Sequence, residues 1–104
     1  MTPLKVYLEP DFHAARKSLP GNIRQRIQKS IDSLANEPRP PESRLLDVEG
    51  LDVPLAIELR RLRIDAWRLV YAVCPEADWV WVLAIRKRPP YDYKDLQGIV
   101  DRLR

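Results

Sequence analysis

Positively charged side chains are concentrated in two short stretches of the sequence, 58–68 and 86–88, which hold seven of its eighteen lysines and arginines. A guanidinium group stays charged at physiological pH and can bind a phosphate through two parallel hydrogen bonds. Several such groups gathered in space repel one another unless an anion or solvent lies between them. The pattern therefore predicts a binding site for a phosphodiester. The seven cations are Arg60, Arg61, Arg63, Arg68, Arg86, Lys87 and Arg88.

The spacing of the arginines predicts which of them face the same way. Side chains two residues apart in a β-strand lie on one face, so Arg61 and Arg63 share a face. Arg68 begins the next strand across a short turn, and Arg88 lies where the last strand ends. A β-bulge would exchange Arg60 and Arg61 between the two faces, so both remain candidates for the site.

Three successive strands are expected to carry these cations. The runs 57–64, 67–74 and 79–86 are rich in β-branched and aromatic residues, and 75–78 supplies a turn. The second and third runs are apolar at alternating positions of both faces, which is typical of central strands covered on both sides. The first is far more cationic, so one of its faces is expected to meet solvent or a polyanion.

The segments before these strands predict a short strand and two helices. Residues 5–8 form the strand, and apolar residues then recur at helical spacing over 12–19. After Pro20-Gly21, Asn22 can cap a second helix that ends near Asn36. Its apolar stripe consists of Ile23, Ile27, Ile31 and Leu34.

The remaining segments are an irregular connection and a last helix. Residues 38–54 show no sustained period, with a short strand or turn expected at 45–48. Asp92 or Asp95 can cap a helix at the end of the sequence. The apolar face of that helix consists of Leu96, Ile99, Val100 and Leu103.

This order predicts an α+β fold: a small, largely antiparallel sheet with two N-terminal helices packed on one face and a C-terminal helix. With 104 residues, 45% hydrophobic and 32% charged, we expect one domain spanning 1–104. The net charge of +3 does not by itself define a partner. Cys74 is the single cysteine, no apolar run approaches the ~20 residues of a membrane span, and the first residues lack a secretory signal. The expected location is cytoplasmic, without a membrane partner.

Two sequence segments resemble the RelE/ParE superfamily, the toxins of type II toxin–antitoxin systems. Segment 58–71 contains the pattern Arg-x-Arg-x-x-x-Trp-Arg-x-Val-Tyr, and segment 82–93 ends a strand with a basic cluster followed by Pro-Pro-Tyr-Asp-Tyr. The predicted order of elements is also similar to that of the superfamily. The resemblance therefore covers nearly the whole sequence.

The resemblance implies a RelE-like ribonuclease that cleaves messenger RNA in the ribosomal A site without a metal or other cofactor. In that reaction a ribose 2′-hydroxyl attacks the adjacent phosphate, which requires charge stabilisation and proton transfer. By position, Arg61, Arg68 and Arg88 would bind the phosphate and stabilise the transition state, and Tyr91 or Tyr93 would stack on a base or assist proton transfer. The RNA-binding residues would be Arg60, Arg63, Arg86 and Lys87.

The sequence departs from the RelE pattern where that enzyme has lysines on its second strand. Arg60 and Arg61 stand there instead, and arginine does not readily release a proton, so the general base is unassigned. One alternative is a ParE-like protein that poisons DNA gyrase. Another is a diverged, non-catalytic member that reaches operator DNA only in an antitoxin complex. All three imply a cognate antitoxin, and the ribonuclease also implies the ribosome and messenger RNA.

Ordinary structural roles compete with these assignments. The arginines could form a solvated strand face, paired with acids such as Glu58 or Asp65. Tyr91 and Tyr93 could simply pack beside the last helix. The single histidine, His13, falls in the first helix, away from the basic strands, and is left out of the site.

Overall fold

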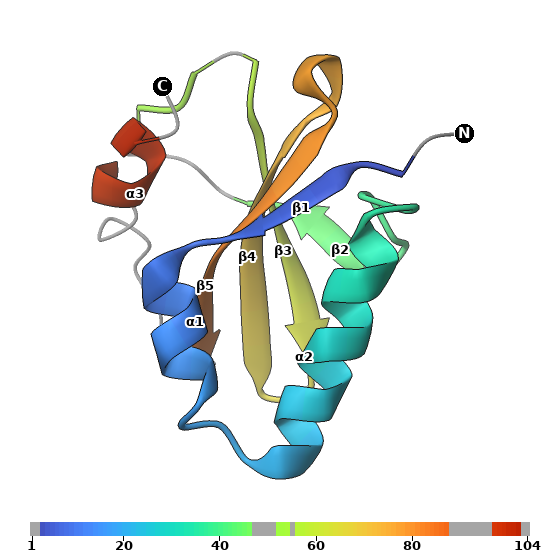
Figure 1. Cartoon of the computed structure of the whole chain (residues 1–104), viewed down its shortest axis with the longest axis vertical. Coiled ribbons are helices and arrows are strands. Elements are labelled where there is room, and N and C mark those ends of the chain that lie inside the picture. Colours follow the sequence, from blue (N-terminus) through green and yellow to red (C-terminus); the bar gives the residue numbers. More distant parts are fainter. Residues whose placement is uncertain (1–2, 47–51, 55, 88–96, 103–104) are drawn as a thin grey trace.

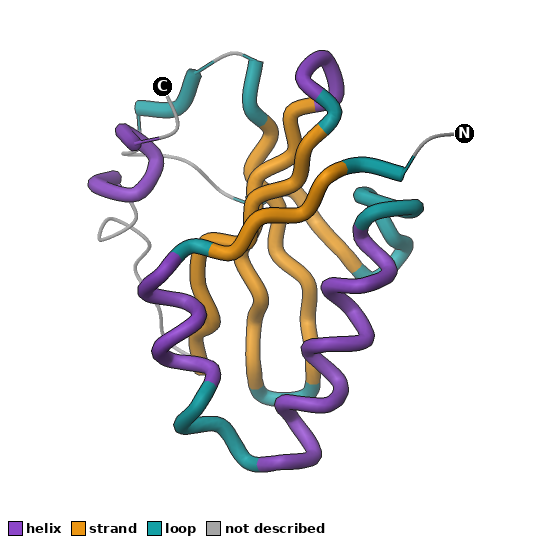
Figure 2. The backbone as a smooth tube through the Cα atoms, viewed as in Figure 1, coloured by secondary structure: helices purple, strands orange, loops and turns teal. Residues whose placement is uncertain are grey.

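The computed structural model describes residues 3–46, 52–54, 56–87 and 97–102, and shows five strands in one sheet together with three α-helices. Their arrangement is drawn in Figure 1 and Figure 2. In chain order the elements are β1 (Lys5–Leu8), α1 (Pro10–Arg16), α2 (Gly21–Leu34), β2 (Ser43–Leu45), β3 (Glu58–Ile64), β4 (Trp67–Cys74), β5 (Trp79–Lys87) and α3 (Gln97–Arg102).

The sheet has the strand order β1-β5-β4-β3-β2. Strands β3, β4 and β5 form an antiparallel meander, β2 pairs antiparallel with the outer edge of β3, and β1 pairs parallel with β5. Asp65, in the turn between β3 and β4, has a positive φ of 53°, a conformation that Asp tolerates better than most residues. The meander therefore places its three strands side by side in the order of the sequence.

Helices α1 and α2 cover one face of the sheet, and they lie in front of it in Figure 1. The predicted apolar stripe of α2 is buried against this face, together with alternate residues of the strands such as Leu62, Ile64 and Leu69. On the opposite face Ile99 and Val100 of α3 pack in a second apolar cluster. We call these the helix face and the far face.

The predicted fold class is confirmed, and several details differ. Helix α2 begins at Gly21, because the extended Pro20 is the N-cap residue and its carbonyl accepts the N–H of Arg24 at 2.9 Å; Asn22 lies inside the first turn and does not cap. The short strand is Ser43–Leu45, earlier than expected. Expectations that concern 88–96 and 103–104, including the capping aspartates, lie outside the described residues.

Within the described parts of the chain, no helix has the length and apolar character needed to cross a membrane.

Candidate phosphate-binding site

Three of the predicted arginines come together on the far face. Arg61, Arg63 and Arg68 line one hollow of about 220 Å³, and Glu42 and Arg44 complete its described lining. We call this hollow the arginine pocket. Arg63 lies directly opposite Arg68 in the register of β3 and β4, so two guanidinium groups are neighbours across the strands.

Strand alternation explains why the arginine pocket lies on the far face. Leu62 and Ile64 belong to the core under α2, so Arg61 and Arg63, at the alternate positions of β3, point the other way. The far face is therefore divided. One part is apolar and lies with Ile99 and Val100 of α3, and the other part carries the arginines.

The strand register places Arg86 and Lys87, two cations of the stretch 86–88, on opposite faces of the sheet. Arg86 pairs with Arg68 and therefore shares its face, but it lines a different hollow next to α3. Lys87 pairs with Trp67, and its ammonium group lies 6.0 Å from the centre of the Trp67 ring. Because Trp67 packs against the helix-face core, Lys87 is directed away from the pocket.

Arg60 is not brought to the arginine pocket. Arg60 faces the opposite way from Arg61, because the pairing of β3 with β4 is regular and no bulge exchanges the two arginines. The irregularity of the meander lies in the pairing of β4 with β5, at Val70/Tyr71. The Nη1 of Arg60 donates to Glu58 Oε2 at 2.9 Å, and its Nε donates to Ser43 Oγ at 3.0 Å. This arginine therefore ties β3 to β2.

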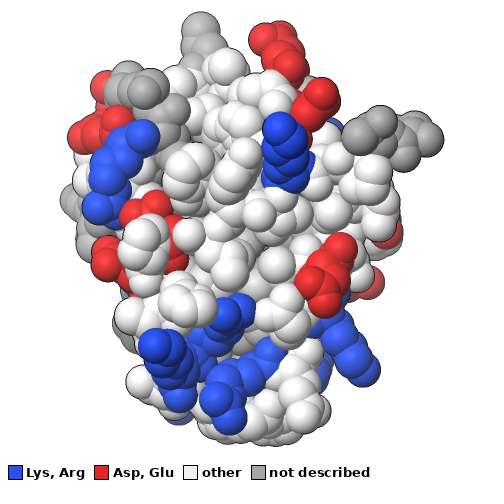
Figure 3. All heavy atoms as spheres, in the orientation of Figure 1, with Lys and Arg blue, Asp and Glu red and all other residues white. Residues whose placement is uncertain are grey.

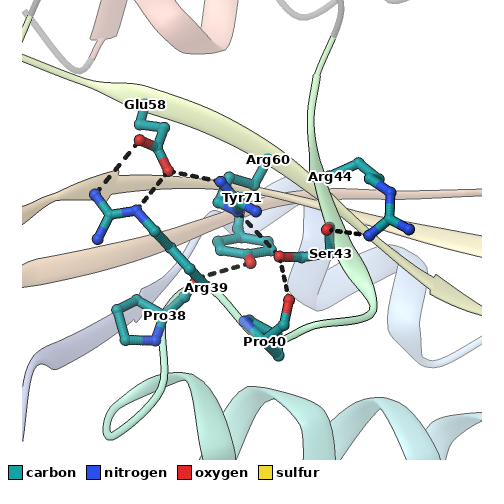
Figure 4. Close-up of polar contacts among 8 residues, drawn as sticks. All are labelled: Pro38, Arg39, Pro40, Ser43, Arg44, Glu58, Arg60 and Tyr71. Carbon is teal, nitrogen blue, oxygen red and sulfur yellow. Dashed lines mark hydrogen bonds and ion pairs between the residues drawn. The ribbon is translucent and has the colours of Figure 1, made fainter.

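Arg60 is part of a polar cluster on the helix face, which we call the clamp and which consists of Arg39, Ser43, Glu58, Arg60 and Tyr71 (Figure 4). Arg39 donates from Nε to Glu58 Oε2 at 2.8 Å, so one carboxylate accepts from two arginines. The clamp therefore joins the segment before β2 to β3.

Two hydroxyl groups of the clamp fix the backbone of that segment. Ser43 Oγ donates to the carbonyl of Pro40 at 2.7 Å, and the Tyr71 hydroxyl donates to the carbonyl of Pro38 at 2.8 Å. Both donors are largely buried, and the described part of the structure leaves no buried side-chain nitrogen or oxygen without a partner. The path of the chain from Pro38 to Ser43 is thus set by hydrogen bonds to the sheet.

The clamp shifts the pKa of two of its members. Partial burial alone would raise the pKa of Glu58, but the hydrogen bonds and charges of Arg39 and Arg60 outweigh it, so the pKa lies below its ordinary value. Burial raises the pKa of Tyr71, which keeps the phenol protonated as a donor to Pro38. The carboxylate is therefore charged and the phenol neutral over the physiological range.

The clamp positions two residues of the pocket that the sequence analysis did not single out. Ser43 is buried and points to the helix face, so Arg44, the next residue of β2, is directed to the other side. Glu42 lies in the turn just before β2 and also lines the pocket. Arg44 also donates from Nη1 to the carbonyls of Pro41, at 2.8 Å, and Ser43, at 3.0 Å, and Figure 4 shows it extending away from the clamp. A strand of three residues is too short to show a period, so the sequence held little signal for either residue.

The acids expected to neutralise the basic strands are engaged elsewhere. Asp65 pairs with Arg26 of α2 at 2.5 Å, and Glu58 belongs to the clamp. Among the described residues that line the pocket, Glu42 is the acid, and within this part of the chain neither Arg61 nor Arg63 has an ion pair. The described lining of the pocket therefore carries more positive than negative charge, which suits an anion.

Three residues that the resemblance assigns to the site, Arg88, Tyr91 and Tyr93, lie outside the described residues. Their assignment remains a prediction.

Comparison with known structures places the fold among RelE toxins. The chain matches an archaeal RelE from the RelE–RelB complex of Pyrococcus horikoshii OT3 with a TM-score of 0.73 and 24% identity, covering 88% of this chain and 100% of that one. It matches a toxin–antitoxin complex, RelBE2 of Mycobacterium tuberculosis, with a TM-score of 0.65 and 21% identity, covering 85% and 94%. It matches isolated Escherichia coli RelE with a TM-score of 0.61 and 19% identity, covering 96% of this chain and 98% of that one.

Sequence comparison identifies the family. No curated protein sequence gives a significant match. The model of a family described as the ParE toxin of the type II toxin–antitoxin system, parDE, matches residues 6–89, which span all of the described sheet except the first residue of β1. The chain therefore belongs to the ParE toxin family, within the RelE/ParE superfamily, and is a toxin of a type II toxin–antitoxin system.

Proposed function

We propose that this toxin is a metal-independent endoribonuclease that cleaves messenger RNA on the ribosome. The observation that carries the proposal is the arginine pocket, where Arg61, Arg63 and Arg68 from adjoining strands line one small hollow. Such a pocket can hold a single phosphate between several guanidinium groups. The charge that develops on the phosphate oxygens in the transition state would then be stabilised by donors already in place.

The reaction requires one proton transfer at the attacking 2′-oxygen and another at the leaving 5′-oxygen. A ribose 2′-oxygen attacks the adjacent phosphorus, the bond from phosphorus to the 5′-oxygen breaks, and the products are a 2′,3′-cyclic phosphate and a free 5′-hydroxyl. A base must take the proton of the 2′-hydroxyl, and an acid must protonate the leaving oxygen. By resemblance, Arg88 would add to the phosphate site and Tyr91 or Tyr93 would assist proton transfer.

Glu42 is our candidate for the general base. Arginines do not give up their protons, so the residues that bind the phosphate cannot take this role. The carboxylate of Glu42 lines the same pocket as Arg61, Arg63 and Arg68, and it is exposed to an incoming substrate. A carboxylate beside a bound phosphate can accept a proton from a neighbouring hydroxyl group.

Gyrase inhibition is the second candidate, favoured by the description of the matching family as ParE toxins. A protein that poisons gyrase by binding it has no need of a pocket that converges on one phosphate. For either activity we propose a small cognate antitoxin as partner, because similar toxins from P. horikoshii and M. tuberculosis were solved in complexes with antitoxins.

The deciding experiment is brief induction of the toxin followed by mapping of new 5′ ends in the transcripts. We expect ends in phase with the codons for the wild type, and their loss in Arg68→Ala and Glu42→Gln. Lys5→Ala is the matched control, because Lys5 is an exposed cation on β1 and does not line the arginine pocket. Intact transcripts together with gyrase-linked DNA breaks would refute the nuclease and support the second candidate.

A further inference from the structure

A second and larger hollow lies beside the arginine pocket, between α2 and the edge of β3. Its volume is about 450 Å³, against about 220 Å³ for the arginine pocket, and we call it the edge groove. It exists because β2 is short. β2 pairs with residues 60–62 of β3, so Arg63 and Ile64 continue along an edge that β2 does not cover.

The lining of the edge groove combines an apolar part with positive charge. Pro40 and the small exposed parts of Leu62 and Ile64 supply apolar surface. Lys29 of α2 and Arg63 of β3 supply cations, whereas Arg26 is paired with Asp65. Two acids, Glu37 and Glu42, also line the groove. An apolar surface next to cations suits a nucleotide, because the base can pack on the former while the latter attract the phosphates. Its volume also lies within the ~300–1,000 Å³ that is common for small-ligand sites.

Two serines add hydrogen-bond acceptors to the groove. Ser30 Oγ donates to the carbonyl of Arg26, and Ser33 Oγ donates to the carbonyl of Lys29, each at 3.0 Å. Because the hydroxyl hydrogens are used within the helix, the oxygen lone pairs are left to accept from a ligand, as from the amino group of a base. Both serines line the groove.

The edge groove adjoins the arginine pocket. Glu42 and Arg63 line both hollows, at the place where the edge of β3 separates the far face from the helix face. The surface around α1 and α2 adds long-range attraction, because Lys and Arg side chains gather at the end of the molecule where these two helices meet (Figure 3). An RNA strand that leaves the pocket can therefore pass around this edge.

We propose that the edge groove binds the nucleotide next to the scissile phosphate, so that the toxin holds RNA over two adjoining subsites. This inference rests on the proposed function, because it assigns the neighbouring phosphate to the arginine pocket. A groove that contacts a base is also a place where the identity of that base can affect cleavage.

The test compares two uncleavable ligands, a 2′-O-methyl nucleoside 3′-monophosphate and the corresponding 2′-O-methyl dinucleotide, by titration calorimetry. We expect the dinucleotide to bind the wild type about tenfold more tightly, as for one packed base. Ser33→Trp fills the groove and should abolish that gain while leaving mononucleotide binding unchanged. Gln25→Trp is the matched control, because Gln25 is exposed on α2 and does not line the groove.

Lys29→Ala is a second variant in case Ser33→Trp does not fold, since it removes a cation without adding bulk. It should reduce the gain in affinity of the dinucleotide at least twofold. The inference is overturned if the wild type shows no gain, or if folded Ser33→Trp and Lys29→Ala both retain it. Failure of the proposed function is distinguishable: transcripts then stay intact in cells, or Arg68→Ala leaves mononucleotide binding unchanged.

Discussion

The clamp and the arginine pocket both contain arginines of β3, on opposite faces of the strand, but the arginines are paired with an acid in one and crowded together in the other. In the clamp, the carboxylate of Glu58 accepts from both Arg39 and Arg60, so the charges are largely matched within the protein. Among the described residues that line the pocket, the arginines outnumber the acid, Glu42. The comparison teaches that an arginine cluster keeps its positive charge available for an anion where few carboxylates lie nearby, and forms a structural tie where a carboxylate lies among the guanidinium groups.

The largest effect is expected from the pocket. Arg61→Ala should lower cleavage of messenger RNA on programmed ribosomes by about 100- to 1,000-fold, the loss seen when one donor to a transition-state charge is removed. The melting temperature should stay the same or rise, because a like charge is removed from a crowded site. A fall in both activity and stability would contradict the division between pocket and clamp. Arg61→Lys keeps the charge but not the two-pronged geometry, so it should recover activity only in part.

Removing the shared carboxylate of the clamp should affect stability first. Glu58→Ala leaves Arg39 and Arg60 without their acceptor and should lower the free energy of unfolding by about 1–3 kcal/mol, measured by urea titration. Cleavage should also fall, because Glu42 and Arg44 lose the tie that directs them to the pocket. An unchanged urea midpoint would show that the clamp does not hold the segment before β2.

A smaller change is expected from the tyrosine of the clamp. Tyr71→Phe deletes the hydrogen bond to the carbonyl of Pro38 while keeping the buried ring. The free energy of unfolding should fall by about 0.5–1.5 kcal/mol, the usual contribution of one hydrogen bond. Val70→Ala, on the other face of β4, is a useful contrast, because it should destabilise the protein through lost apolar packing without altering the clamp. Equal stability of Tyr71→Phe and the wild type would remove this residue from the clamp.

The smallest effect concerns pH. Because the pKa of Glu58 is lowered in the folded protein, the unfolded chain binds its proton more readily, and stability from this group rises with pH. Its contribution is complete above the unfolded value near 4.5 and is lost as the pH falls through the lower folded value. The difference in urea midpoint between wild type and Glu58→Gln should therefore be constant near neutrality and shrink in acid. A difference that grows in acid would show that folding raises the pKa of Glu58 and would contradict this prediction.

The sequence predicted the elements that have a strong period and left out those held by long-range contacts. The stripe of α2 and the continuous apolar run of β4 are visible in the residues themselves, and alternation along β3 was enough to put Arg61 and Arg63 on one face. Of the two partners of Arg60, Glu58 is two residues away and could be named from the sequence, whereas Ser43 lies 17 residues away, across a segment without a period, and had no local signal.

The candidate site was accordingly predicted in part. The convergence of Arg61, Arg63 and Arg68 followed from strand order, whereas Glu42 and Arg44 enter the pocket because β2 adds to the edge of β3. The edge groove depends on where β2 stops pairing, which no composition or spacing could indicate. The pairing of the three-residue strand β2 with β3 therefore determines both features that could not be predicted, the entry of Glu42 and Arg44 into the pocket and the edge groove.

The parallel pairing of β1 with β5 has a consequence for synthesis of the toxin. The first strand to leave the ribosome must wait for the last one, because Lys5–Leu8 pairs with Trp79–Val82. Contacts so distant in sequence close slowly, since the intervening chain must first be ordered. The nascent chain thus exposes an uncompleted sheet until β5 has left the ribosome, so this topology delays completion of the sheet during translation.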